Sequence, residues 1–318
     1  METTDYQNLV LRTSDLKPSL TRGIRVLAHV SAWTALATYL SFSENIWMWL
    51  CGQFLYGLVE LQWFVLLHDF GHNHFFKSSR LNWVFGYISS VFCLVPYAPW
   101  KFIHSQHHTW TGWHDLDPTQ ESTLPKQSKP ATNKIANVCW LLGIPALTLA
   151  FSFKNFWNLP RLFRLFPDLA KRTHFIFSIL LLVIVFTAQV YFVPGFLAAW
   201  SLGYGFFLFL SDPLLISQHV HIPQKISNGS SVIPFSVKEQ DQYTRTLVFP
   251  VWFSKYILLG FDKHTLHHII PRLPCYHLNS VDYTFPGSIS WHKWLVIAKR
   301  TPAEKLLFSN NNKTGLNI

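Results

Sequence analysis

The chain has 318 residues, of which 49% are hydrophobic and only 13% charged, and its mean hydropathy is +0.18. Soluble proteins carry about 25% charged residues, so this composition excludes an ordinary soluble protein and favours a membrane protein with a substantial polar part. The formal net charge is +10, but no nucleic-acid motif accompanies the basic residues, so no nucleic-acid partner is expected. The four cysteines are dispersed and form neither a disulfide framework nor a metal pattern.

The N-terminal part predicts a cytosolic arm followed by two membrane spans. Residues 1–23 are polar, and apolar stretches follow at residues 26–42 and 46–67, separated by a short polar break. The second stretch is long enough to cross about 30 Å of hydrocarbon. No small-residue cleavage site stands out, so the first stretch is expected to remain as an uncleaved span.

The middle of the chain contains two further clear spans and several interrupted apolar segments. Residues 175–193 and 195–216 are predominantly apolar and are joined by a tight Pro-Gly turn. Residues 82–99 and 135–153 are broken by glycine and proline. We expect the first to be surface-lying or buried instead of a full span, and the second to lie in the membrane interface or dip into the membrane. Residues 247–260 form a shorter apolar stretch.

The basic residues predict the orientation of these spans. All 26 Lys and Arg residues fall before the first span, between the second and third, or after the fourth, and the two breaks at 41–45 and 194–195 hold none. Positive residues mark the cytoplasmic side, so both termini are expected there. The predicted fold is all-α and integral to the membrane, with about four transmembrane helices and a cytosolic helical cap. We divide it into an arm (1–23), a membrane domain (24–300) and a tail (301–318).

Histidines gather in three short boxes on the predicted cytoplasmic side. The first reads HDFGH at 68–72, the second HSQHH at 104–108 and the third HTLHH at 264–268. Positions i, i+3 and i+4 share one face of a helix, so the imidazoles of each box converge. Structural zinc takes four ligands, and eight imidazoles therefore predict two metals, for which iron, copper and zinc are all suited.

These boxes resemble those of the membrane fatty acid desaturase family, whose pattern is H-x(3,4)-H followed by two H-x(2,3)-H-H motifs. The resemblance covers roughly residues 55–280. It includes the stretch from His267 to His277, which is similar to the H-H-x5-P-x-Y-H of acyl-lipid desaturases. It also includes Gln218 to His221, which resembles the Q-x-x-H segment that supplies a further ligand. Many relatives have two adjacent histidines at the end of the first box. Here Asn73 separates His72 from His74, so the role of His74 stays open.

The resemblance implies a non-haem di-iron oxidoreductase of lipid metabolism that uses O2 to desaturate the acyl chain of a lipid. Electrons would come from an external donor, a cytochrome b5-type protein or a ferredoxin, because no His-Pro-Gly-Gly haem stretch is present. The implied membrane is the endoplasmic reticulum or a bacterial inner membrane. His221 is the expected ninth ligand, with His219 as the alternative. The implied ligands are His68, His72, His104, His107, His108, His221, His264, His267 and His268.

Several acidic residues near the boxes have two possible roles. Metal-bound histidines often donate their second nitrogen to a carboxylate, and the nearby carboxylates either do this or are solvated or capping groups. They are Asp69, Asp115, Asp117 and Asp262. Glu60 lies in the second span on nearly the same face as His68. It would line a substrate cavity or polarise the metal site, or else bond to a neighbouring helix.

Other functions remain open on the residues alone. A hydroxylase, acetylenase or ketolase would share the same metal site and differ in how the substrate is held. A membrane zinc hydrolase needs fewer ligands and a free position for water, so eight or nine histidines disfavour it. A metal transporter or sensor without enzyme activity would place its histidines along a path through the spans, whereas these boxes lie near the span ends.

Overall fold

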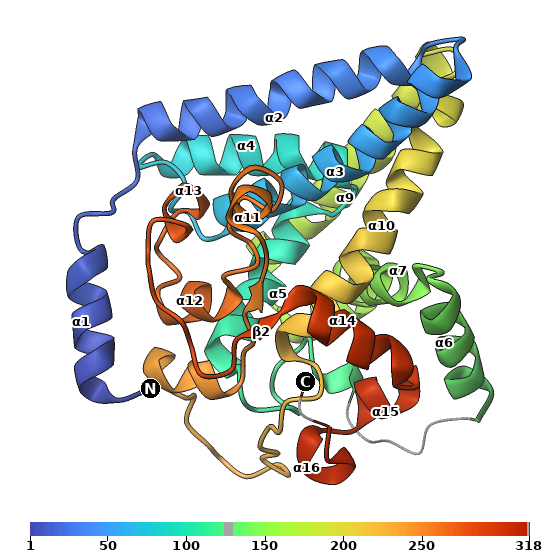
Figure 1. Cartoon of the computed structure of the whole chain (residues 1–318). Coiled ribbons are helices and arrows are strands. Elements are labelled where there is room, and N and C mark those ends of the chain that lie inside the picture. The colour runs from blue at the N-terminus through green and yellow to red at the C-terminus, as the bar shows by residue number, and fades with distance from the viewer. Residues whose placement is uncertain (124–129, 317) are drawn as a thin grey trace.

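The computed structural model describes residues 1–123, 130–316 and 318, and these form an all-α fold, as predicted (Figure 1). Two short strands, β1 (Leu247–Val248) and β2 (Ile289–Ser290), pair in parallel. Short 3-10 helices lie at Glu121–Thr123 (η1) and Val237–Gln242 (η3), and a π-helical turn lies at Phe153–Trp157 (η2). The α-helices are α1 (Thr3–Thr13), α2 (Leu20–Ser41), α3 (Ile46–Gly71), α4 (Ser79–Cys93), α5 (Tyr97–Trp110), α6 (Pro130–Leu142), α7 (Ala146–Ser152), α8 (Leu159–Leu165), α9 (Leu169–Phe192), α10 (Phe196–His219), α11 (Val251–Tyr256), α12 (His264–Ile269), α13 (Cys275–Leu278), α14 (Trp291–Arg300), α15 (Ala303–Phe308) and α16 (Asn311–Thr314).

Within the described residues, three helices, α3, α9 and α10, are long and apolar enough to cross a membrane. They correspond to the predicted second, third and fourth spans. Helices α4 and α5 qualify only as a pair that is bent by 104°, which agrees with the interrupted segment predicted there. Helix α2 covers the predicted first span but does not reach the same apolarity, so its crossing of the membrane stays a prediction.

The spanning helices begin at residues that suit helix starts. The side chain of Asn45 accepts hydrogen bonds from the backbone N–H groups of Trp47 and Met48, and this caps α3. Asp168 accepts a bond from the backbone N–H of Lys171 and caps α9 in the same way. Such side-chain oxygens replace the bonds that the first turn of a helix lacks. Gly195 has a φ of 76°, which lets the chain reverse between α9 and α10.

Hydrogen bonds of polar side chains join α3 to α10 inside the bundle. The amide of Gln53 donates to the carbonyl of Ala199 at 2.7 Å and accepts from the backbone N–H of Gly203 at 2.8 Å. About two turns further along α3, Oε1 of Glu60 accepts from the indole N–H of Trp200 at 2.7 Å. Glu60 is therefore a link between helices, one of the roles expected for it, and the residues that line the main cavity do not include it.

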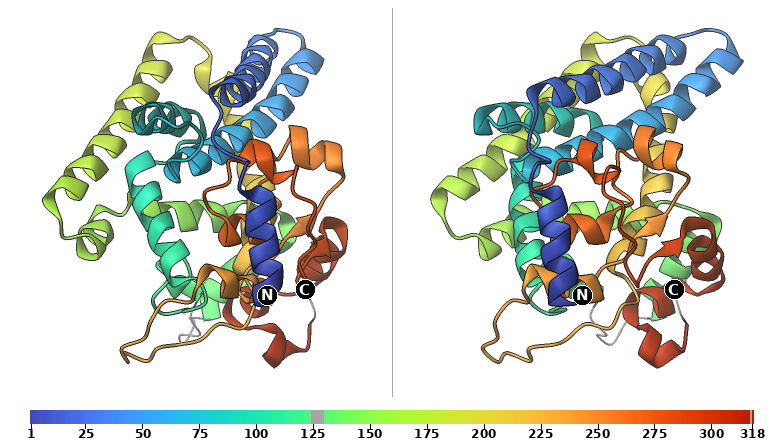
Figure 2. Two further views of the ribbon diagram at one scale, coloured as in Figure 1. Left: turned by 90° about the vertical axis from the view of Figure 1, so that its left-hand side faces the viewer. Right: turned by 60° about the vertical axis from the view of Figure 1, so that its left-hand side comes forward.

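The turns and termini lie at opposite ends of the molecule. The α2–α3 and α9–α10 connections lie together at the upper end in Figures 1 and 2, and both chain termini lie at the lower end. Arg245 ties the lower end together, because its buried guanidinium donates to the carbonyls of Ser217 and Val220 and to the Ile318 oxygen. The C-terminal helices are thus held against the end of α10.

Candidate metal centre

The histidines of all three boxes lie at helix ends that converge in the lower half of the bundle. His68 and His72 come from the end of α3, and the second box occupies the last turns of α5. The third box forms α12, and α10 ends at His219. Within the part of the chain that the structure describes, two groups form in which one nitrogen of each ring lies within 4.8 Å of the others. The first group is His68, His72, His104 and His267, and the second group is His107, His219, His264 and His268.

The nitrogen–nitrogen distances in these groups are close to those expected for ligands of one ion, the shortest being about 0.2 Å below the expected range. In the first group, Nε2 of His104 lies 2.9 Å from Nε2 of His72. In the second group, Nε2 of His219 lies 3.0 Å from Nε2 of His107 and 2.7 Å from Nε2 of His264. Metal–imidazole bonds of about 2.0–2.1 Å give neighbouring ligand atoms a separation of roughly 2.9–3.4 Å in octahedral or tetrahedral shells.

The hydrogen bonds of the second group show that Nε2 of His107 and Nε2 of His219, which face each other, carry lone pairs. Nδ1 of His107 faces the carboxylate of Asp117 at 2.7 Å, and Nδ1 of His219 faces the carbonyl of Tyr243 at 3.0 Å. Both Nδ1 atoms must donate, because their partners can only accept. In the neutral rings the two Nε2 atoms, 3.0 Å apart, are then both acceptors. Two facing lone pairs repel each other, and a cation bound between them removes the repulsion.

His268 repeats this arrangement. Its Nδ1 lies 2.9 Å from Oε1 of Gln240, while its Nε2 is buried and has no hydrogen-bond partner among the residues described. Nε2 of His68 in the first group is likewise buried without a partner in the described part of the chain. Buried polar atoms normally have partners, so these orphaned nitrogens fit metal ligands. The residues present therefore fit a pair of metal ions.

The structure places His219, the alternative for the ninth imidazole, in the second group, whereas the expected His221 lies outside both groups. Helix α10 ends at His219, and His221 follows with a φ of 68° that turns its side chain away. Nε2 of His221 bonds to the hydroxyl of Thr314 at 2.6 Å, so this ring fastens the C-terminal segment. His74 also lies outside both groups.

His108 completes the cluster beside the first group. Its Nε2 lies 3.1 Å from Nε2 of His104 and 3.0 Å from Nε2 of His267. The amide of Gln240 donates to its backbone carbonyl at 2.8 Å, so Gln240 holds both His108 and His268. Sequence reasoning missed Gln240, which lies in η3 and has no spacing relation to any box.

Of the four aspartates that adjoin the boxes, Asp117 alone among the described residues contacts a clustered histidine. It is 1% exposed, and the backbone N–H and hydroxyl of Thr119 both donate to its Oδ1 at 2.8 Å. The other three accept bonds from non-histidine groups and so have structural roles. Asp69 accepts from the Cys275 N–H, Asp115 from Ser227, and Asp262 from the Ser254 hydroxyl.

Aromatic packing positions the first group. The indole of Trp100 stacks on His104 with ring centroids 4.4 Å apart and planes 24° apart, and it packs at 5.4 Å from His68. Phe261 contacts His68 edge-on at 5.3 Å. The box residue Gly71 makes this possible, since a Cβ there would meet Trp100 at 2.2 Å.

Burial keeps the third box neutral at physiological pH. It lowers the pKa of His264 and His268 well below the ordinary value, and it lowers the pKa of His267 to about 3, with neighbouring imidazoles adding to the effect. A neutral imidazole is the form that binds a metal. Burial similarly lowers the pKa of His72 at the end of the first box.

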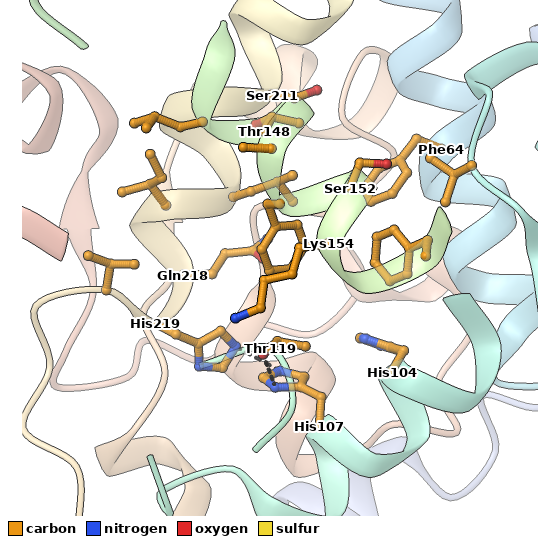
Figure 3. A pocket seen from close by; sticks show the side chains of 18 of the residues that line it. Phe64, His104, His107, Thr119, Thr148, Ser152, Lys154, Ser211, Gln218 and His219 are labelled. Atoms are coloured by element: carbon orange, nitrogen blue, oxygen red, sulfur yellow. Dashed lines mark hydrogen bonds between the residues drawn. The ribbon is translucent and has the colours of Figure 1, made fainter. Parts of the chain in front are cut away.

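A cavity of about 320 Å³ opens directly onto the cluster (Figure 3). Most of its walls are apolar and come from α3, α7, α10 and the C-terminal segment, including Phe64, Phe207 and Phe308. Clustered histidines from both groups form part of the lining, namely His68, His104, His107, His219 and His264. Figure 3 shows His104, His107 and His219 at one end of the cavity and Ser211 and Thr148 at the other. An extended apolar molecule would thus lie against both groups.

Comparison with known proteins connects this site with a family. The family described as Fatty acid desaturase matches residues 44–296. The chain is 25% identical over 302 residues to the chloroplastic omega-6 fatty acid desaturase of Spinacia oleracea, covering 88% of the chain and 64% of that protein. It is 23% identical over 329 residues to the sn-1 oleoyl-lipid 12-desaturase of a Picosynechococcus species, covering 91% and 89%. It is 36% identical over 91 residues to the sn-1 acyl-lipid omega-3 desaturase (ferredoxin) of a Synechocystis species, covering 28% and 24%.

Proposed function

Because this chain belongs to the fatty acid desaturase family, we propose that it introduces a double bond into the acyl chain of a membrane lipid. The observation that carries the proposal is the apolar cavity, whose walls include histidines of both candidate metal groups. An apolar cavity suits an acyl chain, and a chain bound there would have a methylene pair beside the histidines of both groups.

The proposed metals are two iron ions. His68, His72, His104, His108 and His267 would hold one, and His107, His219, His264 and His268 the other. Bound iron would supply O2 activation and removal of hydrogen from an unactivated alkyl chain, which offers no acidic proton to a base. The balanced reaction converts one CH2–CH2 unit, O2, two electrons and two protons into a CH=CH unit and two water molecules.

The protein's own side chains orient and shield this chemistry. Asp117 and Gln240 hold His107 and His268 in fixed directions, and Trp100 holds His104 by stacking. Phe64 and Phe207 line the cavity and exclude water from the reacting carbons. The acyl chain is then positioned by packing, since the alkyl segment itself has no polar group to bond.

We further propose that the centre faces the cytoplasm and takes its electrons from a separate donor. The distribution of basic residues supports this orientation. Donors such as small cytochromes or ferredoxins often have acidic surfaces, and cations including Lys255, Lys263 and Arg272 lie near the third box in the sequence. Opposite charges accelerate encounter, and salt screens them over about 8 Å at physiological ionic strength.

The names of the relatives suggest which substrate to try first. One relative is an oleoyl-lipid 12-desaturase and another an omega-6 desaturase. We therefore propose a lipid with a monounsaturated acyl chain as the substrate and a second double bond towards the methyl end as the product.

Expression in a host that makes oleoyl lipids but no diunsaturated ones tests this function. We expect a diunsaturated fatty acid in the host's lipids, and no such product from a His107→Ala variant that reaches the membrane in equal amount. A hydroxylated fatty acid as the main product would replace desaturase by hydroxylase. Purified protein with one bound zinc and no iron would contradict the oxygen chemistry altogether.

A further inference from the structure

We propose that the two histidine groups hold their metal ions with unequal strength, and that the second group binds first and releases last. This inference rests on the proposed metal centre and concerns the chain's own residues around it. The two groups differ in what holds their rings in place, although each consists of four mutually close imidazoles.

The second group is fixed by hydrogen bonds at three of its four rings. Nδ1 of His107 bonds to Asp117, that of His219 to the Tyr243 carbonyl, and that of His268 to Gln240. Each bond sets the tautomer that leaves Nε2 free to bind a metal. The ligand set therefore exists before an ion arrives, and little ordering remains to oppose binding.

A buried carboxylate further strengthens the metal binding proposed for this group. Asp117 is buried, and Thr119 holds its Oδ1 while its Oδ2 faces Nδ1 of His107. A negative charge on the far side of an imidazole raises the basicity of its metal-binding nitrogen, and losing such a partner typically costs 10–100-fold in metal affinity.

Among the described residues, Gln240 holds the backbone of His108 beside the first group, but the rings of the first group have no equivalent hydrogen bonds. The hydrogen bonds of His72, His104 and His267 there are all to other imidazoles, and Nε2 of His68 has no partner. Its rings are positioned by Trp100 and Phe261, which contact His104 and His68. Packing restrains the ring planes but fixes no tautomer and adds no charge, so the ion bound here is held less tightly.

Metal titration of the purified, metal-stripped full chain tests the proposal. We expect Co²⁺, followed by its absorption spectrum and by competition with a chelator, to bind in two phases that differ at least tenfold in affinity. His72→Ala, which removes a ligand of the first group, should abolish the weaker phase and leave the tighter one. Asp117→Asn should weaken the tighter phase 10–100-fold.

Asp115→Asn is the matched control, because Asp115 lies two residues away and bonds to Ser227 instead of a histidine. It should leave both phases unchanged. Two ions bound with one affinity by the unaltered protein would overturn the proposal, and so would an Asp117→Asn change confined to the phase that His72→Ala removes. Failure to bind any metal would instead contradict the proposed metal centre itself.

Discussion

Gly71 leaves room for the Trp100 ring, which stacks on His104 of the first group. A methyl group on this residue would lie 2.2 Å from the Trp100 ring, which is buried and stacked on His104. We expect Gly71→Ala to displace the indole, to cost about 1–3 kcal/mol of stability, and to lower both iron content and product formation. Metal analysis and lipid profiling of the same preparation measure these effects.

Gly205→Ala is the control for that change, because nothing lies within 4 Å of the position its Cβ would occupy. It should keep full iron content. A Gly71→Ala protein that also keeps full iron and full activity would show that the stacking of Trp100 on His104 has no part in metal binding.

His219 and His221 lie two residues apart and should respond differently to the same substitution. His219 has its Nε2 within the second group, whereas His221 bonds to Thr314. We expect His219→Ala to lose product by at least a hundredfold and to lose bound metal. His221→Ala should keep its metal and lose stability of the C-terminal segment only. Iron content per chain and the rate of proteolysis near residue 314 distinguish the two, and an inactive, iron-poor His221→Ala protein would restore the original prediction.

At the scale of helices, the contact between α3 and α10 depends on small residues. A Cβ on Gly203 would meet the side chain of Tyr56 at 2.5 Å and the carbonyl of Gln53 at 3.1 Å. Gly203→Ala should therefore push the helices apart and lower the melting temperature of the detergent-solubilised protein. Gly205→Ala, on the same helix, should leave it unchanged or raise it, since alanine favours helices by about 1 kcal/mol over glycine. Equal melting temperatures would contradict tight packing at this seam.

The helices also show what sequence patterns reveal and what they miss. The i, i+3, i+4 spacing of the boxes is a property of one helix, so the convergence of His104, His107 and His108 could be predicted. The choice between His219 and His221 depended on where α10 ends and on the positive φ that follows, which no local pattern fixed. Gln240 reaches the site only because tertiary folding brings η3 to α12, so no motif pointed to it.

For the whole molecule, the distribution of charge predicts which side of the membrane each end occupies. Reporters fused after Ile318 and inserted at residue 44 should read out as cytoplasmic and external respectively, because the basic residues avoid both short turns. A protease-protection or cysteine-labelling assay provides the measurement. An external reading at residue 318 would overturn the proposed orientation and place the histidine groups on the wrong side for a cytoplasmic donor.

The arrangement of the second metal group along the chain has a consequence for biosynthesis. His107 is translated early, His219 much later, and His264 and His268 near the end. The spanning helices α3, α9 and α10 precede the last box and must insert before the group exists. Their apolar surfaces would therefore have to support insertion, and contacts such as the hydrogen bond of Gln53 to Ala199 would have to support packing, before the second group can bind a metal. Loading of the proposed metals would therefore be a late maturation step for this chain, and a ribosome stalled before residue 264 would leave an inserted protein with an incomplete second group.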